Sequence, residues 1–233
     1  MDSSRYLDRR EQLTTYFDHT AAAAWQALTS NAPVSRVRAT VRAGRDEMRN
    51  TLLDWLPADL SGRTLVDAGC GTGALAIEAA KRGADVYAID VASSLIDVAR
   101  QRMPDDLGAG SVDFHVGDML NELPKKADYV VAMDSLIHYE TADVLAAIER
   151  LASCARHKVL FTRAPWTPAL GLMHFAGRFM PTRSDRAPSI EPTRIDSLTR
   201  QIDERLGAEG WWTGRTQRIR RGFYVSQAIE VTM

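Results

Sequence analysis

Short apolar stretches alternate with segments of helical spacing through the middle of this chain. Runs rich in Val, Ile, Leu and Ala that are bounded by Gly, Asp or Pro are typical of buried strands, whereas apolar positions three or four residues apart indicate helices. Strands are predicted over residues 63–69, 84–91, 112–119, 127–135 and 157–164, and helices over 73–83, 92–103 and 141–155. This alternation predicts a parallel sheet with helices on both faces.

The two ends of the chain depart from that alternation. Two helical patterns precede it, over 5–30 and about 34–56, with a break at Asn31 and Pro33. After Pro192 comes one more helix, and then two strand-like segments that meet at Gly222 predict an antiparallel pair. The predicted fold class is therefore α/β: a doubly wound, Rossmann-like sheet of seven strands, mostly parallel, with an antiparallel C-terminal strand pair and an N-terminal helical cap.

Composition adds a few limits. A chain of 233 residues is long enough for one well-buried α/β domain, which we place over 58–233, with a helical cap or lid over 1–57. A net charge of −1 gives no attraction to nucleic acid. Two cysteines, a charged N-terminus without an apolar core, and no apolar window of ~20 residues predict a cytoplasmic protein without a signal peptide or a membrane-spanning helix.

A glycine-rich loop, "LVDAGCGTG" over residues 65–73, lies between a predicted strand and a predicted helix. Glycines let the backbone approach a ligand closely, and the helix N-terminus offers free N–H groups. Gly69, Gly71 and Ala74 satisfy the dinucleotide pattern G-x-G-x-x-G/A. On the loop alone, a dinucleotide site and a tight turn without any ligand both remain open.

Carboxylates at the ends of the first three strands narrow that choice. Asp67 precedes the first glycine, Asp90 ends the second strand about 20 residues later, and Asp118 ends the third. Ligands of open α/β sheets bind outside the carboxyl ends of the strands. Three carboxylates there suit a cationic amine, a ribose and an adenine better than a pyrophosphate. Asp67 has an alternative role as a partner of nearby backbone N–H groups.

The motifs "LVDAGCGTG", "AID" and "GDM" at this spacing resemble the first three motifs of the class I S-adenosylmethionine-dependent methyltransferases. The resemblance implies that the 58–233 domain binds S-adenosylmethionine, with S-adenosylhomocysteine as product. The cofactor-binding residues that it implies are Asp67, Ala68, Gly69, Cys70, Gly71, Asp90, Val91, Asp118, Met119 and Met133.

Four longer segments are similar to one family, the magnesium-protoporphyrin O-methyltransferases of chlorophyll and bacteriochlorophyll synthesis. They are "YFDHTAAAAWQALTS", "VSRVRATVRAGRDEMRNTLLDWL", the glycine-loop region through "AIDVA", and "SLIHY". The resemblance implies methylation of a propionate carboxylate of magnesium protoporphyrin IX, with Tyr16 and His138 catalytic and Arg38 beside the cofactor. It also suggests the porphyrin-binding subunit of magnesium chelatase as a partner. No histidine pair has metal-ligand spacing, so no protein-bound metal is expected.

The chemistry of a propionate limits what Tyr16 and His138 need to do. Its pKa of roughly 4–5 means that it is ionised at pH 7, so the site must mainly desolvate the carboxylate and align it. We expect both side chains to hydrogen-bond the propionate or its surroundings. A structural histidine and a tyrosine packed in the core are the alternatives.

Two further features have open interpretations. Arg38, Arg42, Arg45 and Arg49 share one helical face; a solvated face paired with Asp46, Glu47 and Asp54 is favoured for the set, although Arg38 and a neighbour are suited to a carboxylate. The segment 164–190 is a candidate substrate-binding insertion, in which Trp166, Met173 and Phe175 form a wall for an apolar macrocycle. The same segment is a candidate for peripheral membrane or protein contact, or for a helix packed on the core.

Three other functions remain to be distinguished. The methyl acceptor could be another small molecule such as a quinone or an amine. A nicotinamide-dependent oxidoreductase is disfavoured by Asp118 and by the hairpin-like C-terminus. A non-catalytic module that binds S-adenosylmethionine would keep the cofactor residues and have an inert Tyr16 and His138.

Overall fold

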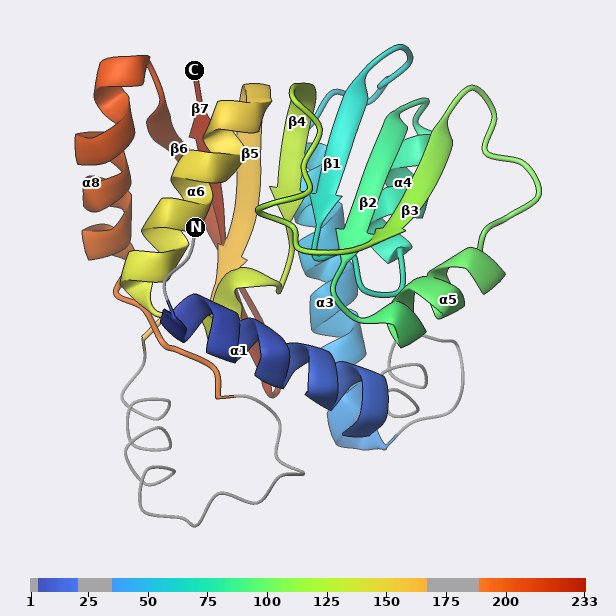
Figure 1. Cartoon of the computed structure of the whole chain (residues 1–233), viewed down its shortest axis with the longest axis horizontal. Helices are drawn as coiled ribbons and strands as arrows, with labels where there is room; N and C mark the ends of the chain where they lie inside the picture. Colours follow the sequence, from blue (N-terminus) through green and yellow to red (C-terminus); the bar gives the residue numbers. More distant parts are fainter. Residues whose placement is uncertain (1–3, 21–34, 167–188) are drawn as a thin grey trace.

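The computed structural model describes residues 4–20, 35–166 and 189–233. Within them, one sheet of seven strands has the order β3-β2-β1-β4-β5-β7-β6 (Figure 1). The strands are β1 Thr64–Ala68, β2 Asp85–Asp90, β3 Ser111–Val116, β4 Ala127–Ala132, β5 Ala155–Arg163, β6 Trp212–Arg221 and β7 Tyr224–Thr232. The first five are parallel, and β7 is antiparallel to both β5 and β6. The predicted fold class is confirmed, and the insertion of β7 between β5 and β6 is a detail that the strand pattern did not predict.

Helices cover both faces of the sheet, as the alternation predicted. On one face lie α3 Arg36–Asp54, α4 Ala74–Lys81 and α5 Ser93–Gln101, and on the other α6 Thr141–Cys154 and α8 Ile195–Leu206. Each face has its own core of buried side chains. In α8, for example, Leu198, Ile202 and Leu206 are buried at the spacing read from the sequence.

The two N-terminal helices occupy different places. Helix α1 Ser4–Thr15 crosses the carboxyl ends of the strands (Figure 1), and a short π-helix, Tyr16–Thr20, follows it. Tyr6 of α1 is buried, stacks on Tyr139 with ring centroids 5.1 Å apart, and donates a hydrogen bond of 2.6 Å to Asp118. Helix α1 is thereby fixed over the edge of the sheet where ligands of this fold bind.

Helix α3 instead packs against the sheet face at β6 and β7. Its C-terminal half carries the buried Met48 and Leu52, whereas Val37 in its first turns is exposed. Gly44 allows the close approach, because a Cβ atom there would lie 2.5 Å from the ring of Tyr224. The separation of 1–57 as one cap remains a prediction. Asn31, Pro33 and most of the 164–190 insertion, including Met173 and Phe175, lie outside the described residues.

None of the helices in the described part of the chain has the length and apolar character needed to cross a bilayer.

Candidate active site

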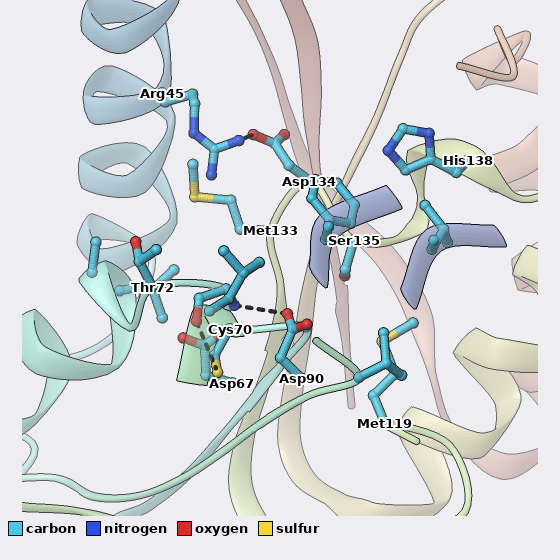
Figure 2. A pocket seen from close by; sticks show the side chains of 18 of the residues that line it. Arg45, Asp67, Cys70, Thr72, Asp90, Met119, Met133, Asp134, Ser135 and His138 are labelled. Atoms are coloured by element: carbon cyan, nitrogen blue, oxygen red, sulfur yellow. Dashed lines mark hydrogen bonds and ion pairs between the residues drawn. The ribbon is translucent and has the colours of Figure 1, made fainter. Parts of the chain in front are cut away.

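A cavity of about 300 Å³ opens at the carboxyl ends of β1, β2 and β4, beside α1 and α3. Figure 2 shows that side chains from distant parts of the chain converge on it. Its wall is formed by Tyr6, Leu13, Phe17, Arg42, Arg45, Asp46, Arg49, Asp67, Gly69, Cys70, Gly71, Thr72, Ala74, Leu75, Asp90, Val91, Leu95, Met119, Met133, Asp134, Ser135, His138 and Tyr139. The structure thus brings together most of the residues that the sequence motifs singled out.

The glycine loop makes the first part of the wall. Gly69, Gly71 and Gly73 have φ angles of +79°, +54° and +74°, in the region that other residues rarely adopt. At Gly69 there is also no room for a side chain, because a Cβ atom would lie 2.3 Å from the Cβ of Ser135. The loop therefore requires glycine for its backbone conformation and for its contact with the segment after β4.

Two carboxylates, the buried Asp67 and the half-buried Asp90, lie beside this loop (Figure 2). Asp90 accepts hydrogen bonds from the backbone N–H groups of Gly71 and Ala92, at 2.8 and 2.9 Å. Asp67 is 1% exposed, and its Oδ2 has no hydrogen-bond partner within the described residues. Burial and the nearby charge of Asp90 raise the pKa of Asp67 to about 7. A buried carboxylate with one unpartnered oxygen beside a cavity fits a cationic group of a ligand.

The third predicted carboxylate behaves differently. Asp118 does not line the cavity, because Tyr6 and Arg10 of α1 bind its carboxylate, Arg10 at 2.8 Å. Its neighbour Met119 does line the wall, whereas the buried Ala68 does not. The remaining predicted cofactor residues of the class I motifs, namely Asp67, Gly69, Cys70, Gly71, Asp90, Val91 and Met133, are all wall residues. Their individual roles stay predictions.

His138 ends a short 3₁₀ turn, η2 Leu136–His138, between β4 and α6. Its Nδ1 lies 3.2 Å from the carbonyl oxygen of Ser189, and Phe17 packs near its ring with centroids 6.5 Å apart. Burial lowers the pKa of His138 below its usual value, although the hydrogen bond to Ser189 opposes this. The imidazole is therefore mainly neutral at pH 7. A neutral ring bonded to a carbonyl through Nδ1 carries its proton there, which leaves Nε2 as the acceptor.

Three other predicted residues lie away from the wall. Tyr16 contacts Phe17 edge to face, with ring centroids 5.2 Å apart, but only Phe17 lines the cavity. Arg38 is exposed near the start of α3. Trp166 is 45% exposed, with the guanidinium of Arg194 5.5 Å from the centre of its ring. The functions assigned to these three side chains stay predictions.

The rest of the arginine face does not behave as a solvated surface. Arg42, Arg45 and Arg49 all line the cavity, and Arg45 forms an ion pair of 2.6 Å with Asp134. Arg49 forms an ion pair of 2.9 Å with Asp46, as the sequence suggested for this face.

Asp134 was not singled out in the sequence. It has a φ of +56°, unusual outside glycine, and its carboxylate also accepts hydrogen bonds from Tyr224 and Thr162 at 3.0 and 3.1 Å. Its place two residues after the buried strand β4 was the available signal, since ligands of this fold bind at strand ends.

Groups of three or more His, Cys, Asp or Glu side chains that could hold a metal ion are absent from the described ranges 4–20, 35–166 and 189–233.

Comparisons with known proteins agree with this geometry. A family model described as "Magnesium-protoporphyrin IX methyltransferase C-terminus" matches residues 132–233, and one described as "Methyltransferase domain" matches residues 65–158. The chain is 43% identical to magnesium-protoporphyrin O-methyltransferase of Rhodobacter capsulatus, over 97% of this chain and 98% of that protein. It is 30% identical to the Synechocystis protein of the same name, over 96% of each chain.

A solved structure is also similar over almost the whole length. Magnesium protoporphyrin IX methyltransferase from Synechocystis PCC 6803 with bound SAH matches with a TM-score of 0.80 and 30% identity, covering 94% of this chain and 97% of that one. The same protein has been solved with bound SAM and matches with a TM-score of 0.78.

Proposed function

This chain belongs to the S-adenosylmethionine-dependent magnesium-protoporphyrin O-methyltransferases, and we propose that it transfers a methyl group from S-adenosylmethionine to a propionate carboxylate of magnesium protoporphyrin IX, giving the monomethyl ester. One observation carries the proposal for this site. A single cavity has the buried carboxylate of Asp67, whose Oδ2 has no partner within the described residues, on one wall and the neutral imidazole of His138 on another.

The glycine-loop wall fits the cofactor. Asp67 offers an unused carboxylate oxygen to the amino group of the methionine portion, and the backbone of Gly69 and Gly71 allows a close approach. Asp90 keeps acceptor capacity for ribose hydroxyls while it holds the loop through Gly71. When bound, S-adenosylmethionine supplies an electrophilic methyl group on a sulfonium.

The opposite wall fits the methyl acceptor. A propionate that enters the cavity loses water, and this raises its pKa, so that part of it arrives as the neutral acid. The unprotonated Nε2 of His138 can take that acidic proton. The carboxylate that results stands beside an imidazolium, whose hydrogen bond fixes one oxygen for attack. Tyr16, through Phe17, and the arginines of α3 complete the polar and apolar surroundings.

Mass analysis of the pigment after incubation with the purified chain and S-adenosylmethionine tests the proposal. We expect magnesium protoporphyrin IX to gain the mass of one methyl group, and to remain unchanged with Asp67→Asn at the same cofactor concentration. Tight cofactor binding without a change in the pigment would overturn the acceptor, and a quinone or an amine would be tested next. A cofactor-bound chain that methylates none of them would be a binding module.

A finer proposal concerns where the enzyme meets its substrate. We propose that it works in the cytoplasm against a membrane surface. Arg36, Arg38 and Arg220 are exposed, and Phe223 at the β6–β7 turn is 76% exposed. The close approach of Gly222 to Thr40 places this turn beside the start of α3. Exposed guanidinium groups and an exposed aromatic ring on these two neighbouring elements suit an anionic bilayer.

Co-sedimentation with vesicles tests this. We expect binding to vesicles that contain phosphatidylglycerol, weaker binding by Phe223→Ser, and none to pure phosphatidylcholine. Absence of binding to both would contradict the membrane proposal and leave a protein donor, such as the porphyrin-binding subunit of magnesium chelatase, as the source of the pigment.

A further inference from the structure

Arg163, the last residue of β5, is 0% exposed, and the acceptors of its hydrogen bonds are uncharged oxygen atoms. It donates to the carbonyl oxygens of Leu136, Tyr139 and Glu191 and, twice, to the hydroxyl of Thr193. Burial lowers the pKa of Arg163 to about 10, so the group stays protonated at pH 7. A buried cation is costly unless its hydrogen bonds are satisfied, so this arrangement needs a reason.

The acceptors belong to two segments that are far apart in the sequence. Leu136 and Tyr139 begin and follow the η2 turn that carries His138, and Glu191 and Thr193 belong to the segment that precedes α8. Arg163 bonds to both, at 3.1 Å to Tyr139 and 3.0 Å to Glu191. One planar fork therefore fixes the distance between the turn and the segment.

The same two segments hold the His138 ring, one through its backbone and the other through its Nδ1. Its backbone is part of the η2 turn, and the acceptor of its Nδ1, the carbonyl of Ser189, is two residues before Glu191. The N–H of Glu191 also donates to the carbonyl of Ile137, at 2.9 Å. A shift of either segment would turn the ring, release Nδ1 or expose it to water.

We propose that Arg163 is the positioning residue of His138: by tying the η2 turn to residues 191–193, it holds the imidazole against Ser189, with Nε2 left for the methyl acceptor. This inference rests on the function proposed above for His138. It gives the buried guanidinium a role in catalysis without contact with substrate or cofactor.

Arg163→Lys is the variant to make, because it keeps the charge and loses the fork. Arg82→Lys is its matched control, since Arg82 also donates to a backbone carbonyl, that of Leu53, at 2.7 Å, but on the other face of the sheet. We expect kcat for magnesium protoporphyrin to fall about tenfold in Arg163→Lys, with the Kd for S-adenosylmethionine within twofold of wild type. Arg82→Lys should change neither.

A second readout separates positioning from general destabilisation. The His138 ring signals, assigned by their loss in His138→Gln, are followed by NMR against pH. In Arg163→Lys we expect the pKa of His138 to rise towards the ordinary value of about 6.5, because the ring becomes hydrated. A lower melting temperature with unchanged kcat and unchanged His138 titration would overturn the proposal.

Thr193→Val decides the matter if Arg163→Lys does not fold. This variant keeps the shape of a side chain that is 4% exposed and removes one acceptor of Arg163. We expect kcat to fall about threefold and the pKa of His138 to rise, as in Arg163→Lys. An unchanged titration of His138 would overturn the proposal. The NMR readout needs no substrate. A wild-type chain that fails to methylate the pigment would therefore refute the proposed function, while the effect on His138 would still be measured.

Discussion

The two walls of the cavity are built in different ways. The glycine-loop wall comes from two consecutive strand–loop units, and its characteristic hydrogen bond, from Gly71 to Asp90, spans 19 residues. The opposite wall is joined by contacts between residues far apart in sequence, 89 residues for Arg45 with Asp134 and 51 for His138 with Ser189. The glycine-loop wall suits a cofactor shared by many enzymes, whereas the opposite wall can differ between enzymes with different methyl acceptors.

The largest effect should come from the point where the two walls touch. Gly69→Ala would place a Cβ atom 2.3 Å from Ser135 and hold a left-handed φ of +79°. We expect kcat/KM for S-adenosylmethionine to fall about a thousandfold, because both walls must move. Gly62→Ala is the control: it has a similar φ of +70° but open space around it, so it should cost roughly 1 kcal/mol of stability and no activity. Equal losses in the two variants would mean that backbone strain alone explains Gly69.

The variant Asp67→Asn tests the glycine-loop wall alone. Isothermal titration calorimetry should show an about hundredfold weaker affinity for S-adenosylmethionine, since a buried charged partner of the amine is lost. In the wild type, affinity should fall as the pH drops through about 7, where Asp67 takes up a proton.

Stability should change in the opposite sense. The folded-state pKa of Asp67 is raised, so its contribution is most favourable at low pH and is lost as the pH rises through about 7. Above pH 7 the cofactor-free Asp67→Asn protein should therefore melt at a higher temperature than wild type. Asp85→Asn, at the exposed start of β2, should alter neither property. A pH-independent cofactor affinity in the wild type would contradict the assignment.

Variants on the side of the methyl acceptor should lower kcat and leave the affinity for the cofactor unchanged. For His138→Gln we expect kcat about thirtyfold lower, and for Tyr16→Phe a smaller loss, with cofactor affinity unchanged in both. Because the pKa of His138 is lowered, wild-type kcat should hold at neutral pH and fall only below about 6.5, as Nε2 becomes protonated. His138→Gln should lack that decline. His157→Gln, at the far end of β5, is the control. Full turnover in both His138→Gln and Tyr16→Phe would remove them from the mechanism.

The same contrast explains what the sequence could predict. Strand and helix periodicity predicted each strand and each α-helix from β1 to β5, but not the η2 turn, and the loop "LVDAGCGTG" pointed to the cavity. The contact of Asp118 with α1 could not be read from its motif, because it depends on where a distant helix lies. The same holds for Arg45: its helical face was visible, but its partner Asp134 is brought to it only by the folded sheet.

The variant with the smallest expected effect tests whether β7 supports the opposite wall. The hydroxyl of Tyr224, on β7, donates to Asp134 at 3.0 Å beside the ion pair with Arg45. Burial raises the pKa of Tyr224, so it remains a neutral donor at all working pH values. Tyr224→Phe removes one donor and keeps the ring that packs on Gly44. We expect kcat to fall two- to threefold, with the cofactor Kd unchanged.

Tyr87→Phe is the matched control for Tyr224→Phe, since Tyr87 donates to the carbonyl of Glu122 at 2.7 Å outside the cavity wall. If Tyr224→Phe lowers cofactor affinity instead of kcat, then Asp134 and Arg45 serve the cofactor and belong with the glycine-loop wall. If neither quantity changes, Arg45 alone is sufficient to hold Asp134 in its left-handed conformation, and β7 contributes packing but no polar support to the site.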